Sequence, residues 1–311
     1  MMKRLVPLAL ACLLSLPAAA ADKLTVLLDW AVNPDHAALF AAQSQGFFAA
    51  QGLEVELIAP SDPNDPPKLV AAGKADLAVT YQPQLVLLVD AGLPLRRVAT
   101  LVDTPLNSLA VLANGPVKTL ADLKGRKIGY SVAGFEDALL QAMLKSAGLV
   151  PADVTLINVN FALATALASG QVDGVIGAFR NFEIPEMRLL GKPARIFAVE
   201  DHGVPAYDEL IVVAAADKVD DPRIARFNAA LEAGVTFTLN HPDAAWAAFV
   251  KDHPELNDDL NREAWALTLP RLAASPAALD PARFARIAAF LKDAGLITRA
   301  GNASDYAAMP R

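Results

Sequence analysis

The feature that most constrains the fold is a β-α-β-α-β pattern that occupies fewer than sixty residues, Leu28–Gln84. Apolar runs at 24–28 and 76–80 predict the two buried outer strands of this unit. In open α/β sheets, ligands bind outside the carboxyl ends of the strands. The unit therefore predicts half of a small-molecule site, formed by the residues that follow its outer strands: Asp29, Trp30, Tyr81 and Gln82.

Strand and helix patterns alternate through most of the chain, which indicates an α/β architecture. Asn33-Pro34 is a suitable start for a helix that continues through His36–Ala50. The Pro-rich segment Ser61–Pro67 is expected to be a loop. A second unit begins near Leu120, with strands expected at 127–131, 154–159 and 173–176 and helices at 136–147 and 162–168.

Two segments of the chain echo each other, AAGKADLAVTY (71–81) and ASGQVDGVIGAF (168–179). In each, a run of small residues stops at glycine, an aspartate follows, and an apolar strand ends in an aromatic residue. Common helix-to-strand loop chemistry explains the echo. A pair of similar lobes explains it as well, and we favour two lobes.

Apolar segments at 108–113 and 209–215 bracket the second unit and are expected to carry the chain between the lobes. Two lobes joined by two crossings leave a central cleft, and such clefts close around a ligand by a hinge motion. The predicted division places 22–110 and 212–311 in lobe 1 and 111–211 in lobe 2.

The region after the second crossing, 222–296, is expected to be helical. Proline is favoured in the first turn of a helix, where its missing N–H group has no partner to lose. Helices are therefore predicted to start at Pro242, at Pro281 and near Pro270.

Residues 1–21 have a basic start, an apolar run and an end of small residues. This pattern is typical of a secretory signal peptide, here with cleavage near Ala20 or Ala21. A membrane anchor would need about 20 unbroken apolar residues, whereas Pro7 and Pro17 interrupt this run. The sequence therefore predicts an exported, periplasmic protein.

The only cysteine, Cys12, lies inside the predicted signal peptide, so the mature chain is expected to have no thiol and no disulfide. Loss of Lys3 and Arg4 with that peptide changes the formal charge from −7 to −9. An acidic protein of this kind does not favour nucleic acid or anionic lipid. We expect no nucleic-acid partner and no membrane-spanning segment in the mature chain.

Three motifs stand out: LDWAVNPDHAALFAAQSQGFFAAQGL, SDPNDPPKLVAAGKADLAVTYQPQL and GAFRNFE. Together they resemble the thiamine-pyrimidine-binding subfamily of ABC-transporter periplasmic proteins, which is related to the fungal thiamine-pyrimidine synthases. The likeness covers about residues 24–265. It implies the type II periplasmic binding fold. It also implies capture of formylaminopyrimidine, or a close relative, for a membrane permease driven by a separate ATPase.

The sequence departs from the synthases at their chemistry. Those enzymes carry a cysteine-rich motif, together with a histidine and a lysine used with pyridoxal phosphate. In this chain the histidine position falls near Pro83 and the lysine position near Val79. No HxxxH or CxxC spacing suggests a metal either. We expect a binding protein that is not an enzyme and uses no cofactor.

A pyrimidine calls for aromatic faces and a few convergent carboxylates or amides. Trp30 and Tyr81 are expected to stack on the ring; the alternative is that they fill the interface between the lobes. Phe161, Phe179 and Phe182 stand at positions more typical of core residues.

Residues at the predicted first helix have two interpretations each. Asn33 is expected to cap that helix and can also present backbone N–H groups to the ligand. His36 either donates to a ligand carbonyl or is a structural histidine, and it has no sequence partner that suggests a catalytic triad. Asp29 either binds the ligand or caps the helix.

Glu183 in GAFRNFE is the carboxylate expected to bind the aminopyrimidine edge. A carboxylate accepts from an exocyclic amine and pairs with a protonated ring nitrogen. Arg180 has an ion pair within the lobe as its alternative. Gly134 and Glu136 are placed near the formamide or methylamine tail of the ligand.

The remaining acidic residues have structural interpretations. Asp76 and Asp173 are expected to cap loops, and Asp208 and Glu209 to serve the hinge beside Tyr207. The complete set of predicted ligand-binding residues is Trp30, Asn33, His36, Tyr81, Gly134, Glu136, Asn181, Glu183 and Tyr207.

The sequence thus predicts a monomeric solute-binding component of an ABC importer that delivers a thiamine-precursor pyrimidine, of the formylaminopyrimidine or hydroxymethylpyrimidine type, to its permease. One alternative keeps the binding role but changes the ligand to riboflavin, a sulfonate, nitrate or another heterocycle. The other is an exported enzyme of pyrimidine or thiamine metabolism. A sulfonate site should be rich in cationic groups, whereas the predicted strand ends offer aromatics and acids.

Overall fold

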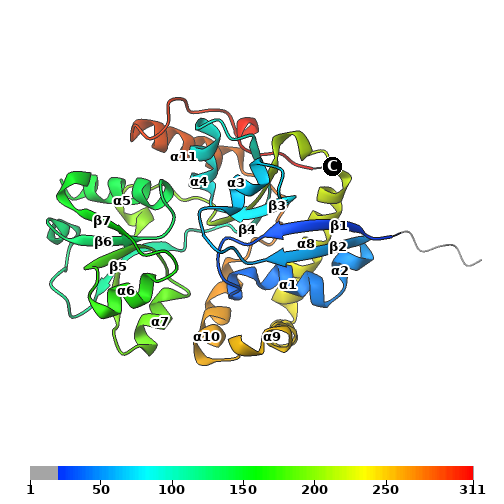
Figure 1. Ribbon diagram of the computed structural model, residues 1–311, viewed down its shortest axis with the longest axis horizontal. Coiled ribbons are helices and arrows are strands. Elements are labelled where there is room, and N and C mark those ends of the chain that lie inside the picture. Colours follow the sequence, from blue (N-terminus) through cyan, green and yellow to red (C-terminus); the bar gives the residue numbers. More distant parts are fainter. Residues whose placement is uncertain (1–19, 311) are drawn as a thin grey trace, which may run out of the picture.

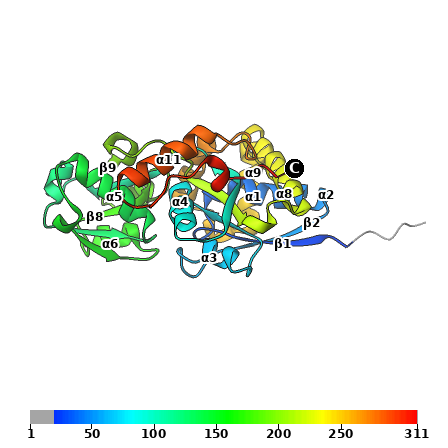
Figure 2. The same cartoon turned by 90° about the horizontal axis from the view of Figure 1, so that it is seen from above.

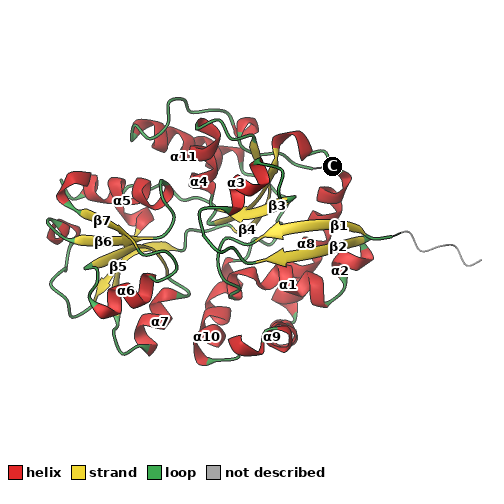
Figure 3. Cartoon of the chain, in the orientation of Figure 1, coloured by secondary structure: helices red, strands yellow, loops and turns green. Residues whose placement is uncertain are grey.

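The chain forms two lobes that lie side by side along its long axis (Figure 1). The computed structural model describes residues 20–310, so most of the predicted signal peptide lies outside the described residues. Each lobe is built on one five-stranded sheet (Figure 3). Seen from above, helices lie on both faces of the sheets (Figure 2). The α/β fold with two lobes, predicted from the sequence, is confirmed.

The first sheet has the strand order β2-β1-β3-β10-β4. The first three of these strands are parallel, and β10 runs antiparallel to both of its neighbours. The strands are β1 (Asp22–Leu27), β2 (Leu53–Ile58), β3 (Leu77–Thr80), β4 (Leu95–Val102) and β10 (Leu210–Ala215).

The second sheet has the order β7-β6-β8-β5-β9 and repeats the topology of the first, with an antiparallel strand in the fourth place. The two sheets therefore match strand for strand, as the sequence echo suggested. The strands are β5 (Asn107–Leu112), β6 (Lys127–Tyr130), β7 (Thr155–Asn158), β8 (Gly174–Phe179) and β9 (Ala194–Ala198).

The echoed aspartates perform one role in both lobes. Asp76 Oδ2 accepts from the backbone N–H of Thr25, and Asp173 Oδ2 accepts from the backbone N–H of Lys127, both at 2.9 Å. Each carboxylate thus joins the start of one strand to its parallel neighbour. Their predicted role as loop caps is confirmed.

The helices of the first lobe come from both ends of the described chain, and those of the second lobe from its middle. In the first lobe they are α1 (Ala37–Ser44), α2 (Phe47–Ala50), α3 (Pro66–Ala71), α4 (Gln82–Asp90), α8 (Pro222–Asn240), α9 (Pro242–Asp252), α10 (Asp259–Thr268) and α11 (Pro281–Asp293). In the second they are α5 (Phe135–Ser146), α6 (Leu163–Ser169) and α7 (Glu183–Leu189).

Three local predictions were wrong. The helix predicted over His36–Ala50 is broken at Gly46, whose φ of 73° lies in the left-handed region that glycine adopts without penalty. Helix α3 begins at Pro66, inside the predicted loop, because proline suits the first helical turn. Pro270 starts no α-helix but lies in a 3₁₀ turn, Leu269–Arg271, that extends α10.

The lobe boundaries differ slightly from the predicted ones. The boundary between 110 and 111 falls inside β5, which pairs with β8 and β9 of the second sheet over its whole length. The boundary between 211 and 212 falls inside β10, which pairs only within the first sheet. The chain therefore crosses between the sheets just before Asn107 and just before Leu210.

Most of the core forms one apolar cluster that includes buried residues of both lobes, and a smaller cluster surrounds α6. Helix α10 of the first lobe packs against α7 of the second. Within residues 20–310, no helix combines the length and apolar character needed to cross a membrane.

Candidate functional site

A pocket lies between the two lobes, where the carboxyl ends of β1, β3 and β8 meet the first turns of α5 and α7. The free space in the pocket and its open mouth together amounts to about 380 Å³. The lobes touch beside it, where Asn64 Nδ2 donates to the carbonyl of Ser131 at 3.1 Å. The lining residues are Asp29, Trp30, Asn33, Asp35 and Tyr81 from the first lobe, and Glu136, Leu163, Gly177, Phe179, Phe182 and Glu183 from the second.

The two aromatic residues predicted to stack on a ligand line the pocket and also contact the opposite lobe. Tyr81 stacks on Phe135, with ring centroids 4.8 Å apart and an interplanar angle of 11°. Trp30 meets the edge of Phe161 at 4.5 Å. Both residues therefore fill the lobe interface, the alternative considered for them, and both also border the pocket; stacking on a ligand stays a prediction.

Asp29 is held by two buried donors. The Tyr81 hydroxyl donates to Oδ2 and His36 Nε2 contacts Oδ1, both at 2.9 Å. Because the backbone N–H of Asn33 donates to Nδ1 of His36 at 3.4 Å, the imidazole proton is assigned to Nε2. Burial, followed by the Asp29 charge, raises the pKa of Tyr81 well above its usual value, so the phenol stays a donor.

His36 is almost fully buried and does not line the pocket; the structure places it behind Asp29, as a residue that orients the carboxylate. Asn33 lines the pocket and also caps the helical segment, because its Oδ1 accepts from the backbone N–H of Asp35 at 2.8 Å.

Asp35 is a pocket residue that the sequence interpretation missed. Its Oδ1 accepts from Asn181 Nδ2 at 2.6 Å and from Thr268 Oγ1 at 2.8 Å. Burial raises its pKa to about 6, against the opposing effect of the Thr268 hydrogen bond. Asn181, a predicted site residue, lies just outside the lining and bridges from the second lobe to the first.

Glu136 follows Phe135 in the first turn of α5, and its Oε2 accepts from the backbone N–H of Ser131 at 2.7 Å. Burial raises the pKa of this carboxyl well above its usual value. The other oxygen lies against Gly177, where an added Cβ would stand 2.3 Å from Oε1. The carboxylate thus occupies space that only glycine leaves free.

Glu183 begins α7, and its Oε2 accepts from the backbone N–H of Phe179 at 2.7 Å. Burial raises the pKa of Glu183 to about 8. The preceding arginine makes the ion pair considered as its alternative: Arg180 Nη1 lies 2.7 Å from Glu200 Oε1. Its charge is therefore already neutralised within the second lobe.

The three buried carboxylates share one arrangement. One oxygen is fixed by the protein, whereas Asp35 Oδ2, Glu136 Oε1 and Glu183 Oε1 make no hydrogen bond to the residues that the structure describes. Among the lining residues in 20–310 there is no lysine or arginine. The pocket therefore offers hydrogen-bond acceptors and several acidic groups, and its described lining supplies no cation.

Besides His36 and Asn181, two further predicted site residues lie away from the pocket lining. Gly134 is exposed at the start of α5. Tyr207 is buried edge-on behind Phe135, and its hydroxyl donates to Glu209 at 3.0 Å.

The segment around Tyr207 belongs to the second crossing between the lobes. Glu209 Oε2 also accepts from the backbone N–H groups of Leu106 and Asn107 at 2.5 and 2.9 Å, which ties the two crossings together. Asp208 pairs with Arg283 of α11. The structural interpretation of these two acids is therefore supported by their contacts.

The pocket residues absent from the predicted set, besides Asp35, are Asp29, which had two open interpretations, Leu163 and Gly177, and two that were treated as core, Phe179 and Phe182. Asp35 stands inside the motif LDWAVNPDHAALFAAQSQGFFAAQGL and could have been found there. Gly177, three residues before Arg180, carries no local signal, because its contact with Glu136 is distant in sequence.

No group of three or more metal-binding side chains occurs in the part of the chain that the structure describes.

Known proteins resemble this chain in both sequence and fold. A family model described as "NMT1/THI5 like" matches residues 33–245. The chain is 52% identical over 296 residues to a "Putative thiamine biosynthesis protein" of Haemophilus influenzae, covering 95% of this chain and 94% of the relative. It is 34% identical to the "Formylaminopyrimidine-binding protein" of Halalkalibacterium halodurans, over 78% of this chain and 74% of that one.

Another relative has an enzyme's name: the "4-amino-5-hydroxymethyl-2-methylpyrimidine phosphate synthase" of Uromyces fabae is 30% identical, over 78% of this chain and 74% of the relative.

Solved structures show the same fold at low identity. The alkanesulfonate-binding protein SsuA from Xanthomonas axonopodis pv. citri, bound to MOPS, matches with a TM-score of 0.72 and 16% identity, over 92% of this chain and 98% of that one. The periplasmic aliphatic sulphonate binding protein SsuA from Escherichia coli matches with a TM-score of 0.69 and 16% identity, over 93% of each chain. The fold is therefore that of the type II periplasmic binding proteins, and by the extent of the sequence matches the chain belongs to the NMT1/THI5 like family.

Proposed function

We propose that this protein is the solute-binding component of an ABC importer and that it captures an aminopyrimidine precursor of thiamine, of the formylaminopyrimidine or hydroxymethylpyrimidine type. The observation that carries the proposal is the set of free carboxylate oxygens on Asp35, Glu136 and Glu183 in a pocket between two lobes. Each of these oxygens borders the pocket and can accept from a donor that enters it. A ligand rich in N–H groups supplies the donors.

An aminopyrimidine fits this demand because it has a flat ring for the aromatic lining and an exocyclic amine for the carboxylates. Trp30, Tyr81 and Phe179 supply the apolar surface. The relative named a formylaminopyrimidine-binding protein supports the same ligand class.

A sulfonate is disfavoured, although the structural neighbours include proteins named for sulfonates. Its negative charge would lie among buried acidic groups, and the lining, as far as the structure describes it, has no lysine or arginine to pair with that charge. The likeness to those neighbours concerns the fold, and fold does not determine the ligand.

The synthase-named relatives make enzymatic activity the second candidate. We propose a binding protein instead. Val79, near the position of the synthase lysine, lies buried in β3, and Pro83, near the histidine position, lies in the first turn of α4. Within the described chain, the pocket lining contains no lysine, histidine or cysteine that would act as a nucleophile or base.

The transport role follows from the proposed export and the two-lobed shape. A monomer exported with its signal peptide removed near Ala20 or Ala21 would collect the pyrimidine in the periplasm. Closure over the ligand would then create the surface that a membrane permease recognises.

Calorimetric titration of the mature protein tests this proposal. Formylaminopyrimidine or 4-amino-5-hydroxymethyl-2-methylpyrimidine should bind with one-to-one stoichiometry, whereas taurine should give no saturable heat. Mass spectrometry after long incubation should recover the pyrimidine unchanged. Binding of taurine in preference to both pyrimidines would overturn the ligand class, and chemical conversion of the pyrimidine would overturn the binding-protein assignment.

A further inference from the structure

Acidic groups face the pocket from several of the elements that surround it. Asp29 follows β1, and Asp35 lies in the 3₁₀ turn Pro34–His36, with His36 behind them. Tyr81 follows β3. Glu136 comes from α5, with half-buried Asp137 beside it. Glu183 comes from α7, with partly buried Glu186 one turn later.

The carboxylates are positioned one by one. Ser131 fixes one oxygen of Glu136, and Phe179 fixes one oxygen of Glu183, each through a backbone N–H at 2.7 Å. The second oxygen of each side chain lines the pocket without a donor from residues 20–310. Both side chains are more than nine-tenths buried. These two oxygens therefore point to a partner that comes from outside the protein.

The ionisation of the buried carboxyl groups indicates the charge of that partner. Several carboxylates buried together cannot all ionise without a cation, since each charge loses its hydration and repels the others. Burial accordingly raises the pKa of Glu183 to about 8 and the pKa of Glu136 well above its usual value, so the empty site favours the protonated form of each carboxyl group. Neutral ligands would leave this arrangement as it is, whereas a cation would allow the carboxylates to ionise.

We propose that the ligand is bound as a cation, a heterocycle with a protonated ring nitrogen whose charge is shared between Glu136 and Glu183. This inference rests on the proposed function and specifies the charge of the ligand in that same site. A neutral aminopyrimidine enters, the proton of one carboxyl group moves to the ring nitrogen, and a carboxylate–pyrimidinium pair remains. No proton from solvent is needed. The exocyclic amine donates to the carbonyl oxygen of the other carboxyl group, which keeps its proton.

The test observes the proton directly. The probe is 4-amino-5-hydroxymethyl-2-methylpyrimidine with ¹⁵N in its ring, bound to the wild-type protein at pH 8. The ring-nitrogen chemical shifts of the complex are compared with those of the free probe at pH 8 and in acid. We expect one nitrogen of the complex to match the acid form. Shifts that match the neutral probe would overturn the proposal.

Single substitutions distinguish the effect of the two pocket carboxyl groups from that of a nearby acidic residue outside the lining. Glu183→Gln and Glu136→Gln should each lower the affinity for the probe by roughly thirty-fold or more, because a charge-assisted hydrogen bond is lost. Glu186→Gln is the matched control, since the same change on the same helix lies outside the pocket lining. Loss of affinity in Glu186→Gln equal to that in Glu183→Gln would point to a general field and contradict the pairing.

Failure of the proposed function would be recognised separately. If no aminopyrimidine binds, benzamidine and benzamide form a second pair of probes, alike in shape and different in charge. The cation inference predicts that benzamidinium binds at least about ten-fold tighter than benzamide, as expected for a charge-assisted hydrogen bond against a neutral one. Equal affinities would overturn the inference whatever the natural ligand is.

Discussion

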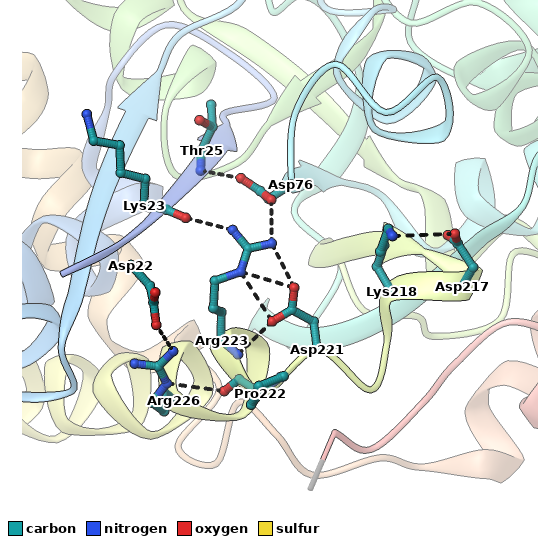
Figure 4. Close-up of polar contacts among 10 residues, drawn as sticks. All are labelled: Asp22, Lys23, Thr25, Asp76, Asp217, Lys218, Asp221, Pro222, Arg223 and Arg226. Atoms are coloured by element: carbon teal, nitrogen blue, oxygen red, sulfur yellow. Dashed lines mark hydrogen bonds and ion pairs between the residues drawn. The ribbon is translucent and has the colours of Figure 1, made fainter. Parts of the chain in front are cut away.

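Two clusters of charged residues in this protein differ in whether their acidic groups are paired with a cation. At the outer end of the first sheet, Arg223 lies between two carboxylates, 2.9 Å from Asp76 and 2.7 Å from Asp221, and Figure 4 shows the guanidinium enclosed by them. Nearby, Arg226 pairs with Asp22 at 2.5 Å. In the pocket, by contrast, buried carboxylates face one another without a cation from the described chain.

The physical environment of the acids differs accordingly. Hydrogen bonds from Arg223 lower the pKa of Asp221, so that carboxylate is ionised in the folded protein whether or not anything binds. Burial raises the pKa of Glu183 to about 8. In the Arg223 cluster every charged group has a partner within the protein, so the cluster stabilises the fold. In the pocket the acidic groups have no cationic partner from the described lining until a ligand supplies one.

The largest effect is expected from Glu183→Gln. The amide keeps the shape but replaces one acceptor oxygen by a donor, and affinity for an aminopyrimidine should fall by at least about 2 kcal/mol. Unfolding stability of the empty protein at pH 8 should stay equal or rise, because a buried acid without a partner has been removed. Calorimetry and urea denaturation measure the two quantities. An unchanged dissociation constant would remove Glu183 from the site.

A glycine in the second lobe tests whether Glu136 needs its position. Gly177→Ala places a Cβ against Oε1 of Glu136 and also imposes a φ of 98° on alanine. We expect loss of affinity together with loss of about 1–2 kcal/mol of stability from the left-handed backbone. Gly170→Ala is the control: φ is 77°, and no described atom lies within 4 Å of its Cβ.

Both glycine variants should therefore lose similar backbone stability, and only Gly177→Ala should lose affinity. Equal affinities in the two variants, measured by titration with the same pyrimidine, would show that Glu136 does not contact the ligand.

The two clusters also differ in their dependence on pH. In the pocket, folded pKa values raised to about 6 for Asp35 and about 8 for Glu183 mean that the folded state holds protons that the unfolded chain has released. The stability that these acids contribute is fully present below about pH 4, which is their pKa in the unfolded chain. It is lost as the pH rises through about 6 to 8. The lowered pKa of Asp221 matters only below about pH 4.

The melting temperature of the empty protein should accordingly fall between pH 5 and pH 8.5. Saturating ligand should reduce this fall, and so should Glu183→Gln. Differential scanning fluorimetry across that range measures it. A melting temperature that rises steadily from pH 5 to pH 8.5 would mean that the pocket acids are already paired.

The sequence predicts the paired cluster better than the pocket. The echo between 71–81 and 168–179 placed Asp76 and Asp173 correctly, because a loop aspartate that binds a neighbouring strand is a local pattern. Strand ends also placed Trp30 and Tyr81 at the pocket. The Asp35 network was missed, since Asn181 and Thr268 lie 146 and 233 residues away along the chain.

The same limit explains the residues that were placed in the site but lie outside its lining. Gly134 and Tyr207 are neighbours of pocket residues along the chain or in space, yet the turn of α5 exposes Gly134 and the hinge buries Tyr207. Which member of a short segment faces a cleft depends on how the opposite lobe packs against it. That packing has no signal in a local pattern.

The smallest effect is expected at the paired cluster, from Asp76→Asn. Asp76 and Arg223 are about one-third exposed, so their ion pair should contribute no more than about 1 kcal/mol, and less at high salt. Asparagine can still accept from the backbone N–H of Thr25. Urea denaturation should show this modest loss, and titration should show unchanged affinity for the pyrimidine. Asp173→Asn, at the corresponding place in the second lobe, should behave alike because its pair with Arg126 is also partly exposed. If Asp76→Asn instead weakened ligand binding as much as Glu183→Gln, the distinction between the two clusters would be wrong: paired acids would not be purely structural, and unpaired acids would not be the ones that bind the ligand.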